Sequence, residues 1–307
     1  MQVLALTPRG YCYGVVDALK KLKDLANDET VERPIHVLGM VVHNQKIVDD
    51  FKALGIHTVH DPKRSRLSLL DDINEGTVVI TAHGASDAVL NKAKKKGLTI
   101  VDTTCKDVKL SQDTIKAYVK LGYIVLFIGK RNHPESETAK SYSDNVFVIE
   151  TINDLEDLDL AQENIAVTNQ TTMSLYDIFP LFEAIKARYP NAELIDEQCD
   201  ATRTRQLAVM HQPKDTDHCF VVGDRHSNNS HKLVEVALKQ GIPANLIESV
   251  EDLDINYLKS LHKVSVTSGA STPSRLTKEV IDYLSSFDAS APKPLVSQVK
   301  KVNLFQK

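Results

Sequence analysis

Three of the four cysteines in this 307-residue chain stand at nearly equal intervals and could act together. Cys12, Cys105 and Cys199 are 93 and 94 residues apart. Each follows a short apolar run typical of a buried strand and precedes a helical pattern. Three thiolates are one short of a structural zinc site, but they suit a [4Fe–4S] cluster with one open iron. The alternative is three buried structural cysteines that never meet.

The fourth cysteine, Cys219, lies inside an apolar, strand-like segment and is typical of a small buried hydrophobic residue.

Polar side chains recur in the same order after each cysteine. One cluster lies 28 to 31 residues after the cysteine, and another lies 66 to 72 residues after it. The first clusters contain His43, His133 with Glu135, and Ser227 with Asn228 and Asn229; the second contain His83, Thr171 and Ser271. Such donors near helix starts suit an anion such as phosphate. Glu135 is the carboxylate beside a cluster histidine and is the candidate proton donor, with a surface glutamate as the alternative.

The elements that position these residues repeat three times. Apolar strand patterns at 34–38, 123–128 and 219–222 precede the first clusters, and others at 77–81, 164–168 and 263–267 precede the second. Strands that alternate with helices predict an α/β fold of three similar units with mostly parallel sheets. The expected units are 13–104, 105–198 and 199–287, the last completed by the N-terminal strand in 1–12, with a loosely held tail at 288–307. Three tandem modules with unlinked cysteines are the alternative.

Parallel sheets collect the segments that follow their strands at one edge. Three units with these edges turned inward would form a pseudo-threefold arrangement around a central iron–sulfur cluster.

Composition narrows the function classes. The chain is 42% hydrophobic and 25% charged with a net charge of −4, which gives no electrostatic footprint for nucleic acid. No apolar stretch approaches the roughly 20 residues that span a bilayer, and no signal-peptide pattern is present, so we expect a cytoplasmic protein without membrane contacts. The sequence also lacks a P-loop, a GxGxxG motif and a GxSxG motif, which disfavours nucleotide-dependent enzymes and serine hydrolases.

The motifs together resemble the family of 4-hydroxy-3-methylbut-2-enyl diphosphate reductases (IspH/LytB). The matching stretches are 8–14 (PRGYCYG), 42–44 (VHN), 82–84 (AHG), 102–105 (DTTC), 133–135 (HPE), 170–172 (QTT), 199–206 (CDATRTRQ), 227–230 (SNNS) and 269–271 (GAS). They cover nearly the whole chain in order, which makes the resemblance highly specific.

The resemblance implies a reductase that ends the methylerythritol phosphate route to isoprenoids. It would remove an allylic hydroxyl with two electrons and two protons, giving isopentenyl and dimethylallyl diphosphate. Cys12, Cys105 and Cys199 would hold one [4Fe–4S] cluster, and Glu135, Thr171 and His133 would be catalytic. The residues implied to bind the diphosphate or line its pocket are His43, His83, His133, Thr171, Ser227, Asn228, Asn229 and Ser271. An outside carrier such as ferredoxin or flavodoxin would supply the electrons.

Some positions depart from the family pattern. Lys106 stands where a proline commonly follows the second cysteine, and 136–138 reads SET instead of VEG. Asn228 replaces the serine of a commoner SSNS run. These departures leave open a paralogue with an altered substrate or a non-catalytic iron–sulfur sensor, and a structural or zinc-binding module is a third possibility. We expect Lys106 to start the helix and to point away from the cluster.

Overall fold

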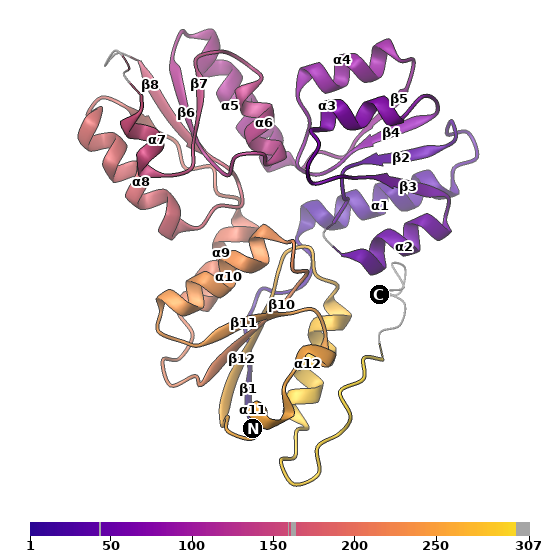
Figure 1. The fold of residues 1–307 in the computed structure, drawn as a ribbon, viewed down its shortest axis with the longest axis vertical. Coiled ribbons are helices and arrows are strands. Elements are labelled where there is room, and N and C mark those ends of the chain that lie inside the picture. The colour runs from indigo at the N-terminus through magenta and orange to yellow at the C-terminus, as the bar shows by residue number, and fades with distance from the viewer. Residues whose placement is uncertain (43, 159, 161–163, 299–307) are drawn as a thin grey trace. The chain divides into compact units, whose positions relative to one another are not determined.

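The structure is a computed structural model that describes all residues except 43, 159, 161–163 and 299–307 (Figure 1). The chain divides into two compact units. The first unit comprises Met1–Val16, Val42–Asp50 and Asp200–Lys307, and the second comprises Asp17–Val41 and Phe51–Cys199.

The second unit contains two parallel four-stranded sheets. Sheet B has the order β3-β2-β4-β5 and sheet C the order β7-β6-β8-β9. The strands of sheet B are β2 (Ile35–Leu38), β3 (Ile56–Val59), β4 (Thr77–Ile80) and β5 (Thr99–Asp102). Those of sheet C are β6 (Ile124–Ile128), β7 (Val146–Ile149), β8 (Ile165–Asn169) and β9 (Glu193–Leu194).

Helices cover both faces of sheet C, and the alternation of its strand residues explains why. Leu126 and Ile128 of β6 face a core completed by α7 and α8, whereas Val125 and Phe127 face one completed by α5 and α6 (Figure 1). Strands buried on both faces read as continuous apolar runs, which is the pattern found in the sequence. These helices are α5 (Lys106–Lys120), α6 (Pro134–Lys140), α7 (Ile152–Glu156) and α8 (Leu175–Arg188).

Sheet B packs one face on the segment between β3 and β4 and on the helix after β4. Leu69, Leu70 and Val89 contribute to this core beneath Val78 and Ile80. The elements are α3 (Arg66–Leu69), the 3-10 helix η1 (Leu70–Asp72) and α4 (Asp87–Lys95). The boundary between the units falls inside two further helices, α1 (Tyr13–Asn27) and α2 (Gln45–Ala53).

The first unit contains sheet A, a parallel sheet of order β1-β12-β10-β11. Its strands are β1 (Gln2–Ala5), β10 (His218–Val222), β11 (Ala244–Ile247) and β12 (Lys263–Ser268). Its helices are α9 (Asp200–Met210), α10 (Asn228–Lys239), η2 (Val250–Asp252), α11 (Ile255–Leu258) and α12 (Ser274–Ser285). In the segment after α12, the Ser297 hydroxyl donates to Glu279 at 2.8 Å and Leu295 packs against the core of this unit.

The three sheets share one strand order. β1, β5 and β9 are the edge strands that lead to the cysteines, and the next strands inward are β12, β4 and β8. The prediction of an α/β fold with three similar parallel sheets is therefore confirmed. Within the described part of the chain, no helix is both long and apolar enough to cross a membrane.

Candidate active site

Each of the three spaced cysteines occupies the same place relative to its own sheet. Each follows an edge strand, and its backbone N–H donates to the carbonyl two residues beyond the end of the adjacent strand. The bonds run from Cys12 to Ala270 (2.9 Å), from Cys105 to Ala82 (3.0 Å) and from Cys199 to Thr171 (3.0 Å). The cysteines are therefore equivalent positions of one repeated local structure.

A helix begins directly after each of these cysteines. α1 starts at Tyr13, α5 at Lys106 and α9 at Asp200, and Cys105 is the N-cap of α5. Helix N-termini favour negative charge, and the thiolate is the form of cysteine that binds metals. The predicted helix start at Lys106 is confirmed, and its side chain is exposed.

The donor set fits an iron–sulfur cluster chemically. All four cysteines are thiols outside any disulfide, and the three spaced ones are half-buried. Cys105 and Cys199 belong to the second unit and Cys12 to the first. Taken over the described residues, no group of three His, Cys, Asp or Glu side chains is arranged to hold a single metal ion.

Cys219 differs from the other three cysteines. It is fully buried in β10, and burial raises the pKa of its thiol. Its interpretation as a buried hydrophobic residue is confirmed.

Glu135 and Thr171 lie together in the second unit. The Thr171 backbone N–H donates to Glu135 Oε2 at 3.0 Å, and its hydroxyl donates to Glu135 Oε1 at 3.2 Å. Glu135 is only 5% exposed. Burial raises the pKa of Glu135 to about 7, against the lowering effect of the bonds from Thr171. A carboxyl group that titrates near neutral pH can hold a proton and donate it.

Local sequence explains how Glu135 comes to be buried. His133 caps α6, because its Nδ1 accepts from the backbone N–H of Glu135 at 3.2 Å, and Pro134 occupies the first turn. Proline suits this position because its missing N–H is not needed there. The cap turns Glu135 inward, where it meets the loop after β8.

Two predicted histidines meet in the same unit. The rings of His83 and His133 lie edge to face, with centroids 5.3 Å apart. His83 follows β4 and His133 follows β6, so the structure brings together four predicted site residues: His83, His133, Glu135 and Thr171. His43 lies outside the described residues; its neighbour Asn44 caps α2 by accepting from the Ile47 N–H at 3.2 Å.

The remaining predicted residues lie in the first unit, after β10 and β12. Ser227 is the N-cap of α10, and its hydroxyl accepts from the Ser230 N–H at 3.3 Å. Ser230 Oγ approaches both Gly223 and Gly269, where a Cβ would lie 2.3 and 2.1 Å away. Because these positions carry no Cβ, Ser230 in the first turn of α10 can lie close to the loops after both strands.

Two side-chain amides at the start of α10 have buried polar atoms with no hydrogen-bond partner among the described residues. They belong to Asn228 and Asn229, and both the oxygen and the nitrogen of each amide are affected. Buried polar groups are normally hydrogen-bonded, so this pair indicates a place for a polar ligand. A 12-residue helix starts here, and the partial positive charge at its N-terminus favours an anion such as phosphate. Ser271, half-buried after β12, follows the neighbouring strand.

Sequence reasoning missed two charged residues that act electrostatically on Glu135. Arg66 of α3 is 7% exposed, and its charge favours the ionised forms of Glu135 and Glu137. Glu197 accepts from the Ser111 hydroxyl at 2.6 Å and from Thr168. Arg66 stands in a charged segment that reads as surface, and its only signal is its helical spacing to Leu69 and Leu70.

Comparison with known proteins agrees with this arrangement. The sequence profile of the family described as LytB protein matches residues 3–285. Among curated proteins, the 4-hydroxy-3-methylbut-2-enyl diphosphate reductase of Anoxybacillus flavithermus is 46% identical over 95% of this chain and 93% of its own length. The reductase of the same name from Brevibacillus brevis is 47% identical over 95% and 94%.

Solved structures give the same result. The E-1-hydroxy-2-methyl-but-2-enyl-4-diphosphate reductase of Plasmodium falciparum superposes with a TM-score of 0.84 at 28% identity, covering 92% of this chain and 87% of that one. A second structure, of (E)-4-hydroxy-3-methyl-but-2-enyl diphosphate reductase, gives 0.63 at 26% identity and covers 92% and 98%. Because the family profile matches more than nine-tenths of this chain, the chain belongs to the LytB protein family.

Proposed function

We propose that this chain reduces 4-hydroxy-3-methylbut-2-enyl diphosphate to isopentenyl and dimethylallyl diphosphate, the last step of the methylerythritol phosphate pathway. The substrate gains two electrons and two protons and loses its hydroxyl as water. The observation that carries the proposal is the buried Glu135, whose carboxylate accepts two hydrogen bonds from Thr171. The reductases named above, at 46% and 47% identity over 95% of the chain, support it.

The family consists of iron–sulfur enzymes, and the residues present fit such a group. We propose that Cys12, Cys105 and Cys199 hold one [4Fe–4S] cluster, supported by their equivalent backbone anchors. When bound, such a cluster supplies electrons and a Lewis-acidic iron for the allylic oxygen. A ferredoxin or flavodoxin would deliver the electrons, and we place the enzyme in the cytoplasm, where thiols stay reduced.

Glu135 would supply the proton that lets the hydroxyl leave as water. A carboxyl group with a pKa of about 7 is largely protonated in mildly acidic solution and still donates readily at neutral pH. The Thr171 hydroxyl is hydrogen-bonded to Glu135 and can turn toward the substrate oxygen, which would orient that oxygen and pass the proton to it. The Thr171 carbonyl also holds the Cys199 N–H, so one residue contacts both the proton donor and a proposed cluster ligand.

The diphosphate would bind to the polar side chains around these groups. His43, His83, His133, Ser227, Asn228, Asn229 and Ser271 are the proposed ligands. The amide groups of Asn228 and Asn229 support this role, because an anion would accept from side-chain nitrogens that have no partner in the described part of the chain.

The repeat units are part of this proposal. We place their bounds at 13–104, 105–198 and 199–287, with the strand in 1–12 completing the third. The common strand order of the sheets supports these bounds.

The test is an anaerobic assay of the full chain. The protein is reconstituted with iron and sulfide and supplied with the allylic diphosphate and a low-potential donor. We expect broad brown absorbance and formation of both products. A brown but inert protein would favour a sensor or a paralogue with another substrate, and a colourless protein would favour unlinked cysteines; either result would overturn the proposal.

A further inference from the structure

Arg66 is a buried cation whose charge acts on the candidate proton donor Glu135. It opens the four-residue helix α3, which Ser65 caps by accepting from the Ser68 N–H at 3.2 Å. Its side chain turns inward and is 7% exposed, whereas Arg64, two residues earlier, is exposed and pairs with Asp72 at 2.6 Å. A buried guanidinium needs charged or hydrogen-bonding partners to offset its lost hydration.

The guanidinium finds hydrogen-bond partners in the loop that carries His83. Nη1 donates to the Gly84 carbonyl, and Nη2 donates to Thr81 Oγ1 at 2.6 Å. The two acceptors flank His83, so the planar fork holds the loop on both sides of the histidine.

A second loop closes over the same group. Gly39 follows β2, and a Cβ built there would lie 3.2 Å from Arg66 Nη2. The backbone therefore passes close to the guanidinium, and the positive φ of 91° at Gly39 suits the glycine that stands there.

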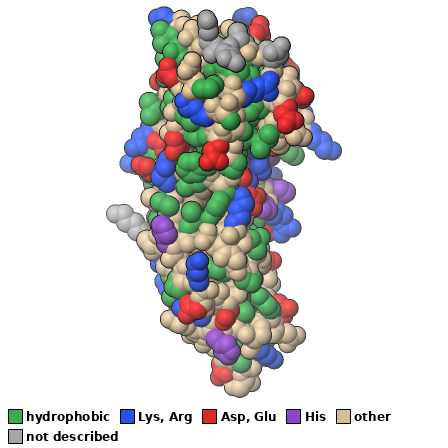
Figure 2. All heavy atoms as spheres, turned by 90° about the vertical axis from the view of Figure 1, so that its left-hand side faces the viewer, with side chains coloured by type: hydrophobic (Ala, Val, Ile, Leu, Met, Phe, Trp, Pro, Cys, Tyr) green, Lys and Arg blue, Asp and Glu red, His purple; other side chains and the backbone are tan. Residues whose placement is uncertain are grey.

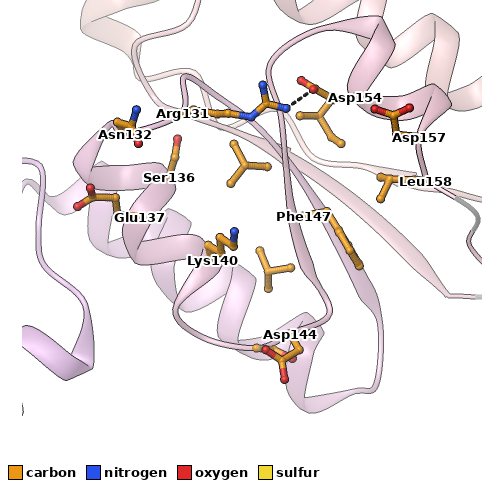
Figure 3. Close-up of a pocket in the computed structure, with 14 residues that line it drawn as sticks. Arg131, Asn132, Ser136, Glu137, Lys140, Asp144, Phe147, Asp154, Asp157 and Leu158 are labelled. Atoms are coloured by element: carbon orange, nitrogen blue, oxygen red, sulfur yellow. Dashed lines mark hydrogen bonds and ion pairs between the residues drawn. The ribbon is translucent and has the colours of Figure 1, made fainter. Parts of the chain in front are cut away.

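Two carboxylates of α6 complete the environment. Burial lowers the pKa of Arg66 to about 10, and the charges of Glu137 and Glu135 oppose this effect in part because they favour the charged guanidinium. Figure 3 shows the Glu137 carboxylate leaving α6 away from Phe147 and Leu158, which line a cavity of about 490 Å³ on the other side of that helix. Glu137 thus borders that cavity but turns its charge away from it.

We propose that Arg66 is a positioning residue of the reductase site, which fixes the His83 loop and balances the negative charge around Glu135. This inference rests on the proposed function. The groups that face Glu135 are Arg66 of α3, Glu197 before α9, the Thr171 N–H and hydroxyl after β8, and His133, which caps its own helix. Two charged side chains of the described residues, Glu197 and Arg66, act on Glu135, and of these Arg66 is the cation.

The experiment separates the charge of Arg66 from its two-pronged geometry. Arg66→Gln removes the charge, Arg66→Lys keeps the charge but loses the fork, and Arg64→Gln is the matched control on the same segment. Two properties are measured in the full chain without substrate: the titration of Glu135, by infrared difference against Glu135→Gln, and amide hydrogen exchange over residues 81–84.

For Arg66→Gln we expect the midpoint of the Glu135 titration to rise by about one pH unit or more, because an opposite charge is lost. Exchange over 81–84 should quicken by about tenfold, because two hydrogen bonds are lost. Arg66→Lys should show the faster exchange with a midpoint close to that of the wild type, and Arg64→Gln should match the wild type in both.

A folded Arg66→Gln protein that matches Arg64→Gln in both measurements would overturn the inference. If Arg66→Gln does not fold, the hydrogen exchange of Arg66→Lys is the deciding measurement. An exchange rate over residues 81–84 equal to that of the wild type would then overturn the inference. Neither measurement needs turnover, so a wild-type holoenzyme that fails to reduce the substrate counts against the proposed function and not against this role of Arg66.

Discussion

The carboxylate of Glu135 accepts two hydrogen bonds from Thr171, one from the backbone N–H at 3.0 Å and one from the hydroxyl at 3.2 Å. The two residues come from different crossovers of sheet C, α6 and the loop after β8. Their contact joins the buried acid to Thr171, and the backbone carbonyl of Thr171 accepts a hydrogen bond from the Cys199 N–H.

Replacing Glu135 with glutamine should abolish proton donation while preserving the shape of the site. General acid catalysis contributes about 10²- to 10⁴-fold to rates, so we expect kcat to fall by about that factor. The holoenzyme assay with a low-potential donor measures it. Glu183→Gln, on the exposed face of α8, is the matched control and should leave kcat unchanged. A fully active Glu135→Gln protein would remove Glu135 from the mechanism.

The raised pKa of Glu135 also ties stability to pH. The value rises from 4.5 to about 7, so the folded protein holds this proton more tightly than the unfolded chain does. The contribution to stability is complete below about pH 4.5 and is lost as the pH rises through about 7, a difference of about 3 kcal/mol.

Urea unfolding of the apoprotein at pH 5 and pH 8 tests this linkage. In Glu135→Gln, the free energy of unfolding should lose the part of its pH dependence that comes from this group. In the assay, kcat of the wild type should decline above about pH 7, and kcat of Glu135→Gln should not show this decline. Identical pH dependence of unfolding in the two proteins would show that Glu135 titrates normally.

Cysteine substitutions should divide into two classes. Cys105→Ser removes a proposed cluster ligand, and we expect most of the iron and the brown absorbance to be lost after anaerobic reconstitution. Cys219→Ala removes a fully buried thiol of β10, and we expect this variant to keep its iron. Iron analysis and the absorbance spectrum report both results, and equal iron in the two variants would argue against the ligand set.

The paired amides at the start of α10 should contribute to substrate affinity. A hydrogen bond to a charged group is worth about 1.5 to 3 kcal/mol, so Asn228→Ala or Asn229→Ala should raise KM by about 10- to 100-fold. Steady-state kinetics with the allylic diphosphate measure the change. Asn153→Ala, at an exposed position of α7, is the control. An unchanged KM in both variants would place the diphosphate elsewhere.

Lys106→Pro should leave cluster binding intact. Lys106 is the first residue of α5, where proline is favoured, and the Cys105 ψ of 144° suits a following proline. We expect iron content equal to that of the wild type, because the backbone before Lys106 already has the extended conformation that a following proline requires. Loss of the cluster in this variant would mean that the turn after Cys105 differs from that of the family.

The sequence was sufficient to predict the repeat, because three sheets of the same strand order leave the same trace of apolar runs and polar loops. Central strands such as β8 and β10 are buried throughout, so their apolar residues at 165–167 and 219–222 follow one another without polar alternation. The spacing of the cysteines identified equivalent positions before any contact was known.

The environment of the acid could not be predicted in this way. The burial of Glu135 depends on the His133 cap and on a loop from another strand, and Arg66 lies in a segment rich in surface charges. Glu135 and Thr171 are 36 positions apart, and Arg66 lies 15 and 18 positions from its acceptors Thr81 and Gly84, separations that no local pattern records.

On the face drawn in Figure 2, the acidic and basic side chains of the described residues are interspersed, in keeping with the small net charge.

Sheet A takes its edge strand from the opposite end of the chain. β1 pairs with β12, and the Cys12 N–H finds its acceptor at Ala270, 258 residues later. During synthesis, sheets B and C can therefore assemble from neighbouring segments as they leave the ribosome, while the first cysteine to be made is the last to be anchored. If Cys12 is a cluster ligand as proposed, this ligand is fixed in place only after the segment with Ala270 has been made.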